Sequence, residues 1–351
     1  MARVRLQGSM LPAALAVLAA FAHFACAAPA QAAEDNFYRG RTVRIFVGFA
    51  PGGGYDLYAR TLGRYIGDHS PGEPTVLVQN MPGAGSLKTA NYIYTVAPKD
   101  GTQFGTFSRG LVLDPLLGHA EGVQYDATRF TWIGSVSNEV AVCALWHTSG
   151  VETWEDMQTK EYKIGGSAPG ADSDVFPTVL RNMFGLPLRL ISGYSGAADI
   201  NLGMQRGEVD GRCGWSWSSL VSQDKAMLDN GQLNIVLQLA LEKHEDRPDV
   251  PLVMDLVDDP RRAAALRLIV SRQAIARPFA APPGIPEDRA RILRAAFDAT
   301  MRDPEFLAEM ERLLLEVRPV PGAELAAIVN EAYASPPDVV SLASEFTKYP
   351  E

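Results

Sequence analysis

Residues 44–60, RIFVGFAPGGGYDLYAR, contain a strand pattern, a glycine-rich loop and a helix pattern in direct succession. Apolar side chains alternate over 41–49, which is the period of a half-buried β-strand. The glycines at 52–54 follow, and from Asp56 onward apolar residues recur at helical spacing. The segment therefore predicts a strand that runs through a glycine loop into a helix.

The same order of elements recurs along the chain. Further strand patterns lie at 75–78, 103–107, 162–164, 188–191 and 209–213. A loop rich in glycine or serine follows each of them. The first two continue the series begun at 41–49, and the last three form a second series. This alternation predicts α/β layers with parallel sheets in two similar lobes, joined around 132–142.

The C-terminal part changes character. Residues 288–300 and 304–315 are rich in Ala, Leu, Arg and Glu and predict two helices, with Pro286 just before the first. A short strand pattern at 274–280 precedes them. We expect this strand to return to the first lobe, which would make that lobe discontinuous. The predicted boundaries are 33–137 with 273–351 for the first lobe and 138–272 for the second.

The N-terminus has the parts of a secretory signal peptide. Two arginines precede an apolar run over 10–22, and small residues around Ala32 form a cleavage-type site. We expect residues 1–32 to be removed near Ala32 on export to the periplasm. A membrane anchor is one alternative, but the run is shorter than the ~20 residues that a span needs. Lipidation at Cys26 is another, although the residues before it lack the usual context.

Composition excludes several classes of protein. The 351 residues carry a net charge of -9, with 47% apolar and 21% charged residues, which is typical of globular proteins and not of disordered chains or membrane bundles. Loss of the signal peptide would make the chain more acidic still, so nucleic acid is not expected as a partner. The few histidines are scattered without metal-ligand spacing, and neither a metal nor another cofactor is expected.

Two motifs resemble known reactive loops without completing them. GAGSLK at 83–88 has Lys88 where a dinucleotide-binding fingerprint has its third glycine. GGSAP at 165–169 has Pro169 where a nucleophile elbow ends in glycine, and no candidate histidine lies close to a matching acid in the expected late position. We therefore expect no catalytic residue.

The glycine-rich loops are better suited to binding. Each leaves the carboxyl end of a predicted strand and enters a helix, where backbone N–H groups and the positive helix end attract an anion such as a small carboxylate. The alternative is that the glycines only make tight turns. Because the chain is acidic, its long-range field would repel an anion, and capture has to be local.

Motifs along the whole predicted mature chain are similar to those of one family. They are FAPGGGYDLYAR at 49–60, QNMPGAGS at 79–86, GYSG at 193–196, GEVD at 207–210 and APPGIP at 281–286. In this order they resemble the signature of the substrate-binding receptors of tripartite tricarboxylate transporters, the Bug family. Because several motifs agree, the resemblance is more specific than any single glycine loop.

The resemblance implies a fold and a function. The fold would be that of type II periplasmic binding proteins, with two doubly wound α/β lobes, a hinge and a ligand cleft between them. The protein would be a monomeric periplasmic receptor, not an enzyme, that captures a small organic carboxylate and delivers it to integral-membrane transporter subunits. Two alternatives are kept: a periplasmic sensor that presents a carboxylate to a signalling partner, and a periplasmic enzyme.

The resemblance also implies which loops hold the ligand. The implied contacts are Gly53, Gly54, Asp56, Gly85 and Ser86 in the first lobe, and Ser167, Ala168, Tyr194, Ser195 and Gly196 in the second. The chain departs from the family pattern at Tyr55 and around Trp215, and with Tyr194 and Trp217 these rings predict a roomier pocket for a bulky or aromatic acid. The alternative is that the two tryptophans pack between the lobe and a helix.

Two charged residues lie beside these loops. Arg109 follows Ser108 at the end of the third strand pattern, and its guanidinium has the geometry to pair with a ligand carboxylate. A solvated or structural role is the alternative. Asp56 lies where an acid caps a helix, with acceptance of a ligand hydroxyl or amine through water as a second role.

Cys143 and Cys213 are the two cysteines outside the predicted signal peptide. In an oxidising compartment such a pair is either bridged or buried as free thiols, and their spacing leaves both open. The topology implied by the resemblance places the strand near 140–146 beside the strand 209–213. That topology favours a disulfide between the two.

Overall fold

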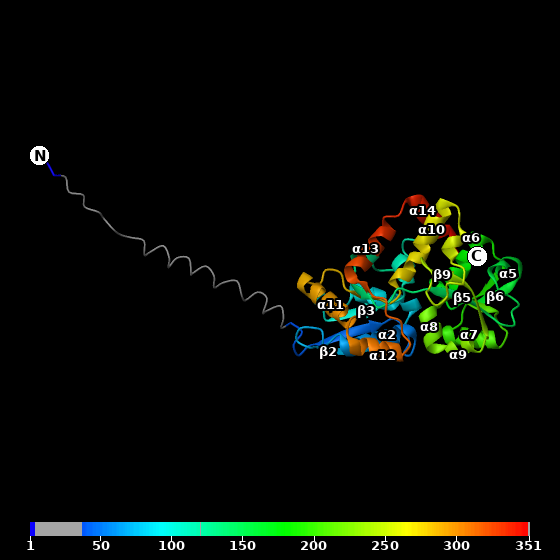
Figure 1. Cartoon of the computed structure of the whole chain (residues 1–351), viewed down its shortest axis with the longest axis horizontal. Helices are drawn as coiled ribbons and strands as arrows, with labels where there is room; N and C mark the ends of the chain where they lie inside the picture. The colour runs from blue at the N-terminus through cyan, green and yellow to red at the C-terminus, as the bar shows by residue number, and fades with distance from the viewer. Residues whose placement is uncertain (4–36, 120, 350–351) are drawn as a thin grey trace.

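A computed structural model describes residues 1–3, 37–119 and 121–349 (Figure 1). Apart from its first three residues, the predicted signal peptide lies outside this part of the chain. Within the described residues, no helix is both long and apolar enough to cross a membrane. The chain forms two lobes, each built on its own sheet, which lie side by side in Figure 1.

The first lobe contains a six-stranded sheet in the order β11-β4-β10-β3-β1-β2. Its strands are β1 (Thr42–Val47), β2 (Thr75–Asn80), β3 (Gln103–Thr106), β4 (Thr131–Ser135), β10 (Pro278–Ala281) and β11 (Val320–Pro321). β1 pairs in parallel with β2 and β3, whereas β10 runs antiparallel to β3 and β4. The parallel strands end at one edge of the sheet, and the glycine loops that follow them meet at that edge.

The helices of the first lobe pack on this sheet. They are α2 (Gly54–Tyr65), α3 (Leu87–Thr95), α4 (Gly110–Leu113), α11 (Glu287–Thr300), α12 (Pro304–Arg312) and α13 (Gly322–Tyr333), with 3₁₀ turns η1 (Ala84–Ser86) and η2 (Ala127–Arg129). Tyr58 and Leu62 of α2 are buried one turn apart and pack in one cluster with Ile45 of β1. The strand, loop and helix predicted from residues 44–60 are confirmed.

The second lobe contains a five-stranded sheet in the order β7-β6-β8-β5-β9. Its strands are β5 (Ala141–Trp146), β6 (Tyr162–Gly165), β7 (Leu188–Ile191), β8 (Gly211–Ser216) and β9 (Leu233–Leu239). Its helices are α5 (Trp154–Thr159), α6 (Asp172–Phe184), α7 (Ala197–Gln205), α8 (Trp217–Gln223) and α9 (Lys225–Asp229). β6 is parallel to β7 and β8, and β5 is antiparallel to β8 and β9.

The chain passes from the first sheet to the second after β4 and returns at β10. The elements before the return are η3 (Val253–Leu256), α10 (Pro260–Val270) and η4 (Ser271–Ile275), and the last helix is α14 (Pro337–Thr347). α14 packs against α10 and against α6 of the second lobe, as the red, yellow and green ribbons show in Figure 1. The boundary residues expected for the two lobes stay a prediction.

The structure corrects two strand predictions. β8 begins and ends later than the predicted strand 209–213. It continues through Gly214, whose φ is +73° and whose ideal Cβ would lie 2.4 Å from the carbonyl oxygen of Asp172, so a side chain here would collide with the start of α6. The strand predicted at 274–280 is shortened to β10, because η4 occupies the residues before it. Both sheets are mixed, not wholly parallel.

Cys143 of β5 and Cys213 of β8 form a disulfide bond. Their strands are antiparallel neighbours in the second sheet, and both side chains are fully buried in its core. The bond joins positions 70 residues apart and so links β5 to the strand that ends at the contact between the lobes.

Loss of this bond should destabilise the fold. For a loop closed over 70 residues, the entropy returned to the unfolded chain corresponds to about 4 kcal/mol. We expect urea unfolding of Cys143→Ala/Cys213→Ala to show a free energy of unfolding lower by about this amount. Alkylation of the denatured, unreduced protein followed by intact mass analysis should find neither thiol free. Two alkylated cysteines, or a double variant as stable as the wild type, would argue against the bond.

Candidate functional site

The loops that follow β1, β2 and β3 meet at one edge of the first sheet. The backbone N–H of Ser108 donates to Oγ of Ser86 (2.8 Å), and the N–H of Arg109 donates to the hydroxyl of Tyr55 (3.1 Å). Gly48 lies so close to this loop that an ideal Cβ on it would be 2.3 Å from Cβ of Ser86. The structure thus brings together four residues that the sequence predicted at the site, from three different parts of the chain.

The loop after β2 has an unusual backbone. Ala84, Gly85 and Ser86 have φ angles of +47°, +60° and +77°, in the left-handed region that side-chain-bearing residues seldom adopt. Such strain persists where the surrounding structure holds it, and it is common at binding sites. Here the buried hydroxyl of Ser86 is held by the hydrogen bond from Ser108, so the strained loop is fixed against the loop after β3.

Asp56 shapes the loop after β1 from the first turn of α2. Its Oδ2 accepts from the N–H of Gly52 (2.8 Å) and from Nε of Arg60 (2.9 Å), and its Oδ1 accepts from Nδ2 of Asn80 (2.7 Å). Burial alone would raise the pKa of Asp56, but these hydrogen bonds outweigh it and hold the pKa below its ordinary value. The carboxylate therefore closes the loop, while Gly53, the N-cap of α2, has no side-chain hydrogen bond.

In the second lobe a carboxylate of the chain itself occupies the loop after β6. Oδ2 of Asp174 accepts from the N–H groups of Ser167 (2.6 Å) and Ala168 (3.0 Å). The hydroxyl of Ser192 donates to Oδ1 of the same carboxylate. These N–H groups were expected to attract a ligand anion, and in this structure they are paired within the lobe.

Tyr194, Ser195 and Gly196 form the loop before α7. The N–H of Tyr194 donates to the carbonyl oxygen of Gly166 (3.1 Å), and its hydroxyl donates to Glu208 (3.2 Å). Both bonds stay within the second lobe. A ligand contact at these three residues stays a prediction.

Trp215 and Trp217 lie in the core of the second lobe. Trp215 belongs to β8, Trp217 begins α8, and both side chains pack in one buried apolar cluster. The guanidinium of Arg212 lies over the Trp215 ring, 4.8 Å from its centre. The two tryptophans are placed as in the packing alternative, and Tyr55 is the predicted aromatic residue that lies at the contact between the lobes.

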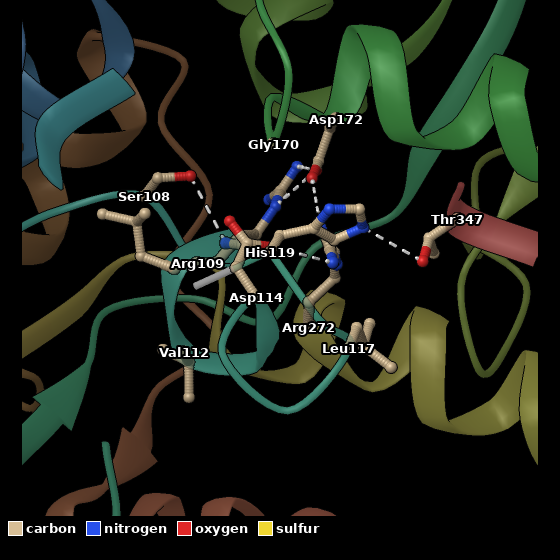
Figure 2. A network of polar contacts seen from close by, with 12 residues as sticks. Ser108, Arg109, Val112, Asp114, Leu117, His119, Gly170, Asp172, Arg272 and Thr347 are labelled. Carbon is tan, nitrogen blue, oxygen red and sulfur yellow. Dashed lines mark hydrogen bonds and ion pairs between the residues drawn. The ribbon is translucent and has the colours of Figure 1, made fainter. Parts of the chain in front are cut away.

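The lobes meet at a buried ion pair between Arg109 and Asp172 (Figure 2). Arg109 follows β3 of the first lobe, and Asp172 is the first residue of α6 in the second. Nη2 and Nε of Arg109 lie 2.6 and 2.7 Å from Oδ2 of Asp172. Nη2 also donates to Oγ of Ser216 at the end of β8 (3.2 Å). Arg109 is 5% exposed, so its charge faces the other lobe and not the solvent.

The segment that returns to the first lobe holds the same carboxylate. Nε2 of Gln273 donates to Oδ2 of Asp172 (3.1 Å), and Nη1 of Arg272 lies 3.5 Å from Oδ1. Arg272 also lies 3.5 Å from Asp114, which comes just after α4. Figure 2 shows Arg109, Asp114, Asp172 and Arg272 gathered in one network.

The charges of this network fix one another's ionisation. Burial alone would lower the pKa of Arg109 and raise that of Asp172, but their mutual attraction outweighs burial, and both pKa values shift toward the charged forms. Asp114 differs, because burial raises its pKa to about 7 against the opposing attraction of Arg272. Removing one partner of a buried ion pair costs about 3–5 kcal/mol. Replacing only Arg109 or only Asp172 would therefore destabilise the folded protein.

Another buried arginine, Arg277, lies beside the first turn of α2. Its Nη2 lies 3.5 Å from Oε2 of Glu139 and donates to Oγ of Ser219 in α8 (3.3 Å). Its guanidinium also lies over two rings, 4.7 Å from the centre of Tyr55 and 5.1 Å from that of Tyr58. Arg277, which lies just before β10, therefore places a positive charge beside the loop that follows β1.

Arg109 and Arg277 each have an N–H group without an acceptor. Among the described residues, Nη1 of Arg109 and Nε of Arg277 have no hydrogen-bond partner, although less than a tenth of each side chain is exposed. A buried donor left unpaired costs about 1–3 kcal/mol, and more when it is charged. These N–H groups are therefore places where an added acceptor, such as a carboxylate oxygen, would be stabilised.

Sequence reasoning missed much of the contact between the lobes. The residues missed are Asp172, Ser216, Ser219, Arg272, Gln273 and Arg277. A signal existed for Asp172, since it starts a helix directly after the glycine loop that ends at Gly170. Arg277 offered a weaker signal, as a charged residue next to the strand expected to return to the first lobe.

In the described part of the chain, no group of three or more His, Cys, Asp or Glu is placed to hold a metal ion.

Asp114→Asn tests the charge balance of this network. Native Asp114 has a pKa of about 7 and an unfolded aspartate about 3.9, so the native state binds the proton more tightly and stability falls as pH rises from about 4 to 7. Asparagine carries no such proton. The stability of the variant relative to the wild type should therefore be higher at pH 8 than at pH 5, by more than about 1 kcal/mol in urea unfolding.

Asp338→Asn is the matched control for that experiment. Asp338 is an exposed acid paired with Arg261, and its variant should show a smaller dependence on pH. A relative stability of Asp114→Asn that does not change between the two pH values, or that falls at pH 8, would show that Asp114 is not protonated in the native protein near neutrality.

Comparison with solved structures finds the same architecture. BugD, described as a periplasmic binding protein, is 22% identical, with 87% of this chain and 97% of its own covered and a TM-score of 0.66. MatC from Rhodopseudomonas palustris with bound malate is 19% identical, with 86% and 99% covered and a TM-score of 0.64. An R. palustris protein with adipate is 16% identical, with 87% and 97% covered and a TM-score of 0.66.

No protein-family model and no curated protein matches the sequence. At identities this low, the structural likeness is evidence of fold. The predicted fold is confirmed: this chain has the two-lobed α/β fold of the periplasmic binding protein BugD and of the malate-bound and adipate-bound proteins of R. palustris.

Proposed function

We propose that this chain is a periplasmic solute-binding receptor of the Bug kind. It captures a small organic carboxylate between its lobes and delivers it to the membrane subunits of a tripartite tricarboxylate-type transporter. The fold and the sequence motifs support the proposal. The observation that carries it is Nη1 of Arg109, a buried cationic donor at the contact between the lobes without an acceptor among the described residues.

Arg109 is oriented to receive one carboxylate. Asp172 takes Nε and Nη2, which fixes the plane of the guanidinium and leaves Nη1 to donate to a ligand oxygen. Such charge-assisted hydrogen bonds are roughly twice as strong as neutral ones. Ser216 accepts from Nη2, so its own hydroxyl proton is available to the same ligand.

Ligand binding would favour the closed arrangement of the lobes. Arg109 belongs to the first lobe, whereas Asp172 and Ser216 belong to the second, so the whole set of contacts exists only when the lobes meet. The ligand would enter while the lobes are apart. Because it would bind the closed form more tightly, it would shift the population toward that form. The segments between β4 and β5 and between β9 and β10 would act as the hinge.

A small aliphatic acid suits this contact better than a bulky aromatic one. The structures titled with malate and with adipate hold acids of this class, and we extend the class, not either compound, to this chain. Trp215 and Trp217 are 1% and 5% exposed and offer little surface to an aromatic ligand. We propose binding without chemical change, as in the binding proteins whose fold the chain shares.

The proposed location in the periplasm and the proposed delivery to a transporter are inferred from the sequence. A signal peptide over 1–32 would export the chain to the periplasm, and the motif resemblance supports the transporter type that we propose. Arg109, Asp172 and Ser216 all belong to this one chain, so a monomer would be sufficient for binding.

Titration calorimetry with short aliphatic mono-, di- and tricarboxylates tests the proposal. The wild-type protein should bind at least one of them. Arg109→Gln should weaken that binding by roughly tenfold to a hundredfold, because a hydrogen bond to a charged group contributes about 1.5–3 kcal/mol. Arg109→Gln/Asp172→Asn should lose affinity too, and it avoids leaving a buried carboxylate unpaired.

Arg212→Gln is the matched control for the Arg109 variants. Arg212 is an arginine of the second lobe, in contact with Trp215 and Asn201 of that lobe, and burial lowers its pKa to about 10. Its variant should bind the ligand as the wild type does, and thermal unfolding should confirm that all variants are folded. Wild-type affinity in both Arg109 variants, or an equal loss in Arg212→Gln, would refute the role of Arg109. A wild-type protein that binds no acid would refute the receptor itself.

A further inference from the structure

Asp114 is a buried acid at the contact between the lobes, and the role proposed for Arg109 makes no use of it. Arg109 precedes the short helix α4 and Asp114 follows it, so roughly 7–8 Å of helix separates the two residues. Asp114 is 4% exposed. A loop of the second lobe covers it, since an ideal Cβ on Gly170 would lie 3.0 Å from its Oδ2. Separation of the lobes would therefore uncover this carboxylate.

Asp114 is held by fewer hydrogen bonds than Asp172, the other acid of the network. Oδ2 of Asp172 accepts from Nε of Arg109 (2.7 Å) and from Nε2 of Gln273 (3.1 Å). Oδ1 of Asp114 has no hydrogen-bond partner among the described residues, although Nη2 of Arg272 lies 3.5 Å away. Hydrogen bonds to a carboxylate stabilise its charged form. Of the two acids, Asp114 is therefore the one that binds a proton more readily.

The charged groups that face Asp114 from neighbouring elements are Arg272 of η4 and Asp172 of α6. Three phenols that form hydrogen bonds with the backbone of α4 or of the covering loop also surround it: Tyr125, Tyr333 and Tyr349. Burial raises the pKa of each phenol above its ordinary value, so all three stay neutral near pH 7. Near neutral pH, these phenols therefore do not compete with Asp114 for a proton.

His119 is the histidine nearest to Asp114 along the chain. Its backbone N–H donates to the carbonyl oxygen of Asp114, and its Nε2 lies 3.2 Å from Oγ1 of Thr347. Burial and the charge of Arg272 lower the pKa of His119 below its ordinary value, so the ring is neutral above pH 7. Asp114 is thus the better acceptor of a proton at this contact.

A bound carboxylate would disturb the charge balance of the network. Without a ligand, Arg109 and Arg272 balance Asp114 and Asp172. A carboxylate on Nη1 of Arg109 would add a third negative charge to two positive ones. For like charges roughly 8 Å apart at an effective dielectric constant of about 20, the repulsion changes an equilibrium constant by more than about tenfold. A proton on Asp114 would restore the balance.

We infer that Asp114 takes up a proton from solvent when a ligand carboxylate binds Arg109, so that the receptor binds its acid more tightly at lower pH. The inference rests on the proposed function, because it assigns the regulation of the same site. Burial already raises the pKa of Asp114 to about 7, and a bound anion raises it further. Because linkage is reciprocal, the proton strengthens ligand binding by the same factor, and the affinity rises as the pH falls from about 8.5 to about 6.5.

Titration calorimetry in HEPES and in Tris, two buffers with different ionisation enthalpies, measures the proton directly. The probes are malate and adipate, followed by the other short aliphatic acids, and these are almost fully ionised at pH 6.5 because carboxyl groups titrate near pH 4. At pH 7.5 the wild-type protein should take up about half a proton or more for each acid bound. Its Kd should be lower at pH 6.5 than at pH 8.5 by about fivefold or more.

Asp114→Asn has the charge of the protonated acid and lacks its titrating group. Its Kd should change by less than about twofold between the two pH values, with almost no proton uptake, and at pH 8.5 it should bind more tightly than the wild type. Asp338→Asn, which removes an exposed acid paired with Arg261, and His119→Gln are the matched controls and should keep the wild-type proton uptake. Thermal unfolding should confirm that all three variants are folded.

The possible outcomes separate this inference from the receptor itself. A wild-type protein that binds an acid without proton uptake and with one Kd at both pH values would overturn the inference and leave the receptor intact, and this measurement needs no variant. Uptake that persists in Asp114→Asn, or that is lost in His119→Gln or Asp338→Asn, would overturn the assignment to Asp114. A wild-type protein that binds none of the acids at either pH would overturn the receptor.

Discussion

The buried ion pair between Arg109 and Asp172 is the interaction on which the arrangement of the two lobes depends. Its partners come from different sheets, and burying either charge alone would be unfavourable by several kcal/mol. Two glycines allow the partners to approach. An ideal Cβ on Gly214 would collide with the start of α6, and one on Gly110 would lie 2.8 Å from the carbonyl oxygen of Gly170. The backbone of each lobe is therefore shaped to let the opposite charges meet.

Buried charges balanced within the chain would also explain how an acidic protein binds an anion, as we propose. Asp56 and Asp174 occupy the N–H groups of the loops after β1 and β6, so these glycine loops are held in shape by internal carboxylates. In the function we propose, recognition of a ligand falls to buried arginine side chains, which have N–H groups without acceptors. Arg109 and Arg277 are each balanced by an acid of the chain, so their charge is not felt at long range, whereas their unpaired N–H groups act at contact distance.

The sequence was sufficient to predict structure that lies within one short continuous segment. The strand, loop and helix at 44–60 follow from periodicity, because each lies within one continuous stretch and buries one face. The loops with Tyr55, Ser86, Ser108 and Arg109 were found by the glycines around them and by position after a strand. Asp172 and Arg277 were missed because their partners are distant in sequence and are met only across the lobes. Trp215 was expected in a loop, and the continuation of β8 through Gly214 places it in the core instead.

The most direct test of this account is mass spectrometry of the small molecules released when the purified protein is denatured. Arg109→Gln/Asp172→Asn, prepared in the same way, gives the background. The account predicts that an intact aliphatic carboxylic acid is enriched in the wild-type sample, near one molecule per chain, and is depleted in the variant. An enriched compound without a carboxylate, or the same acid at equal amounts in both samples, would contradict it.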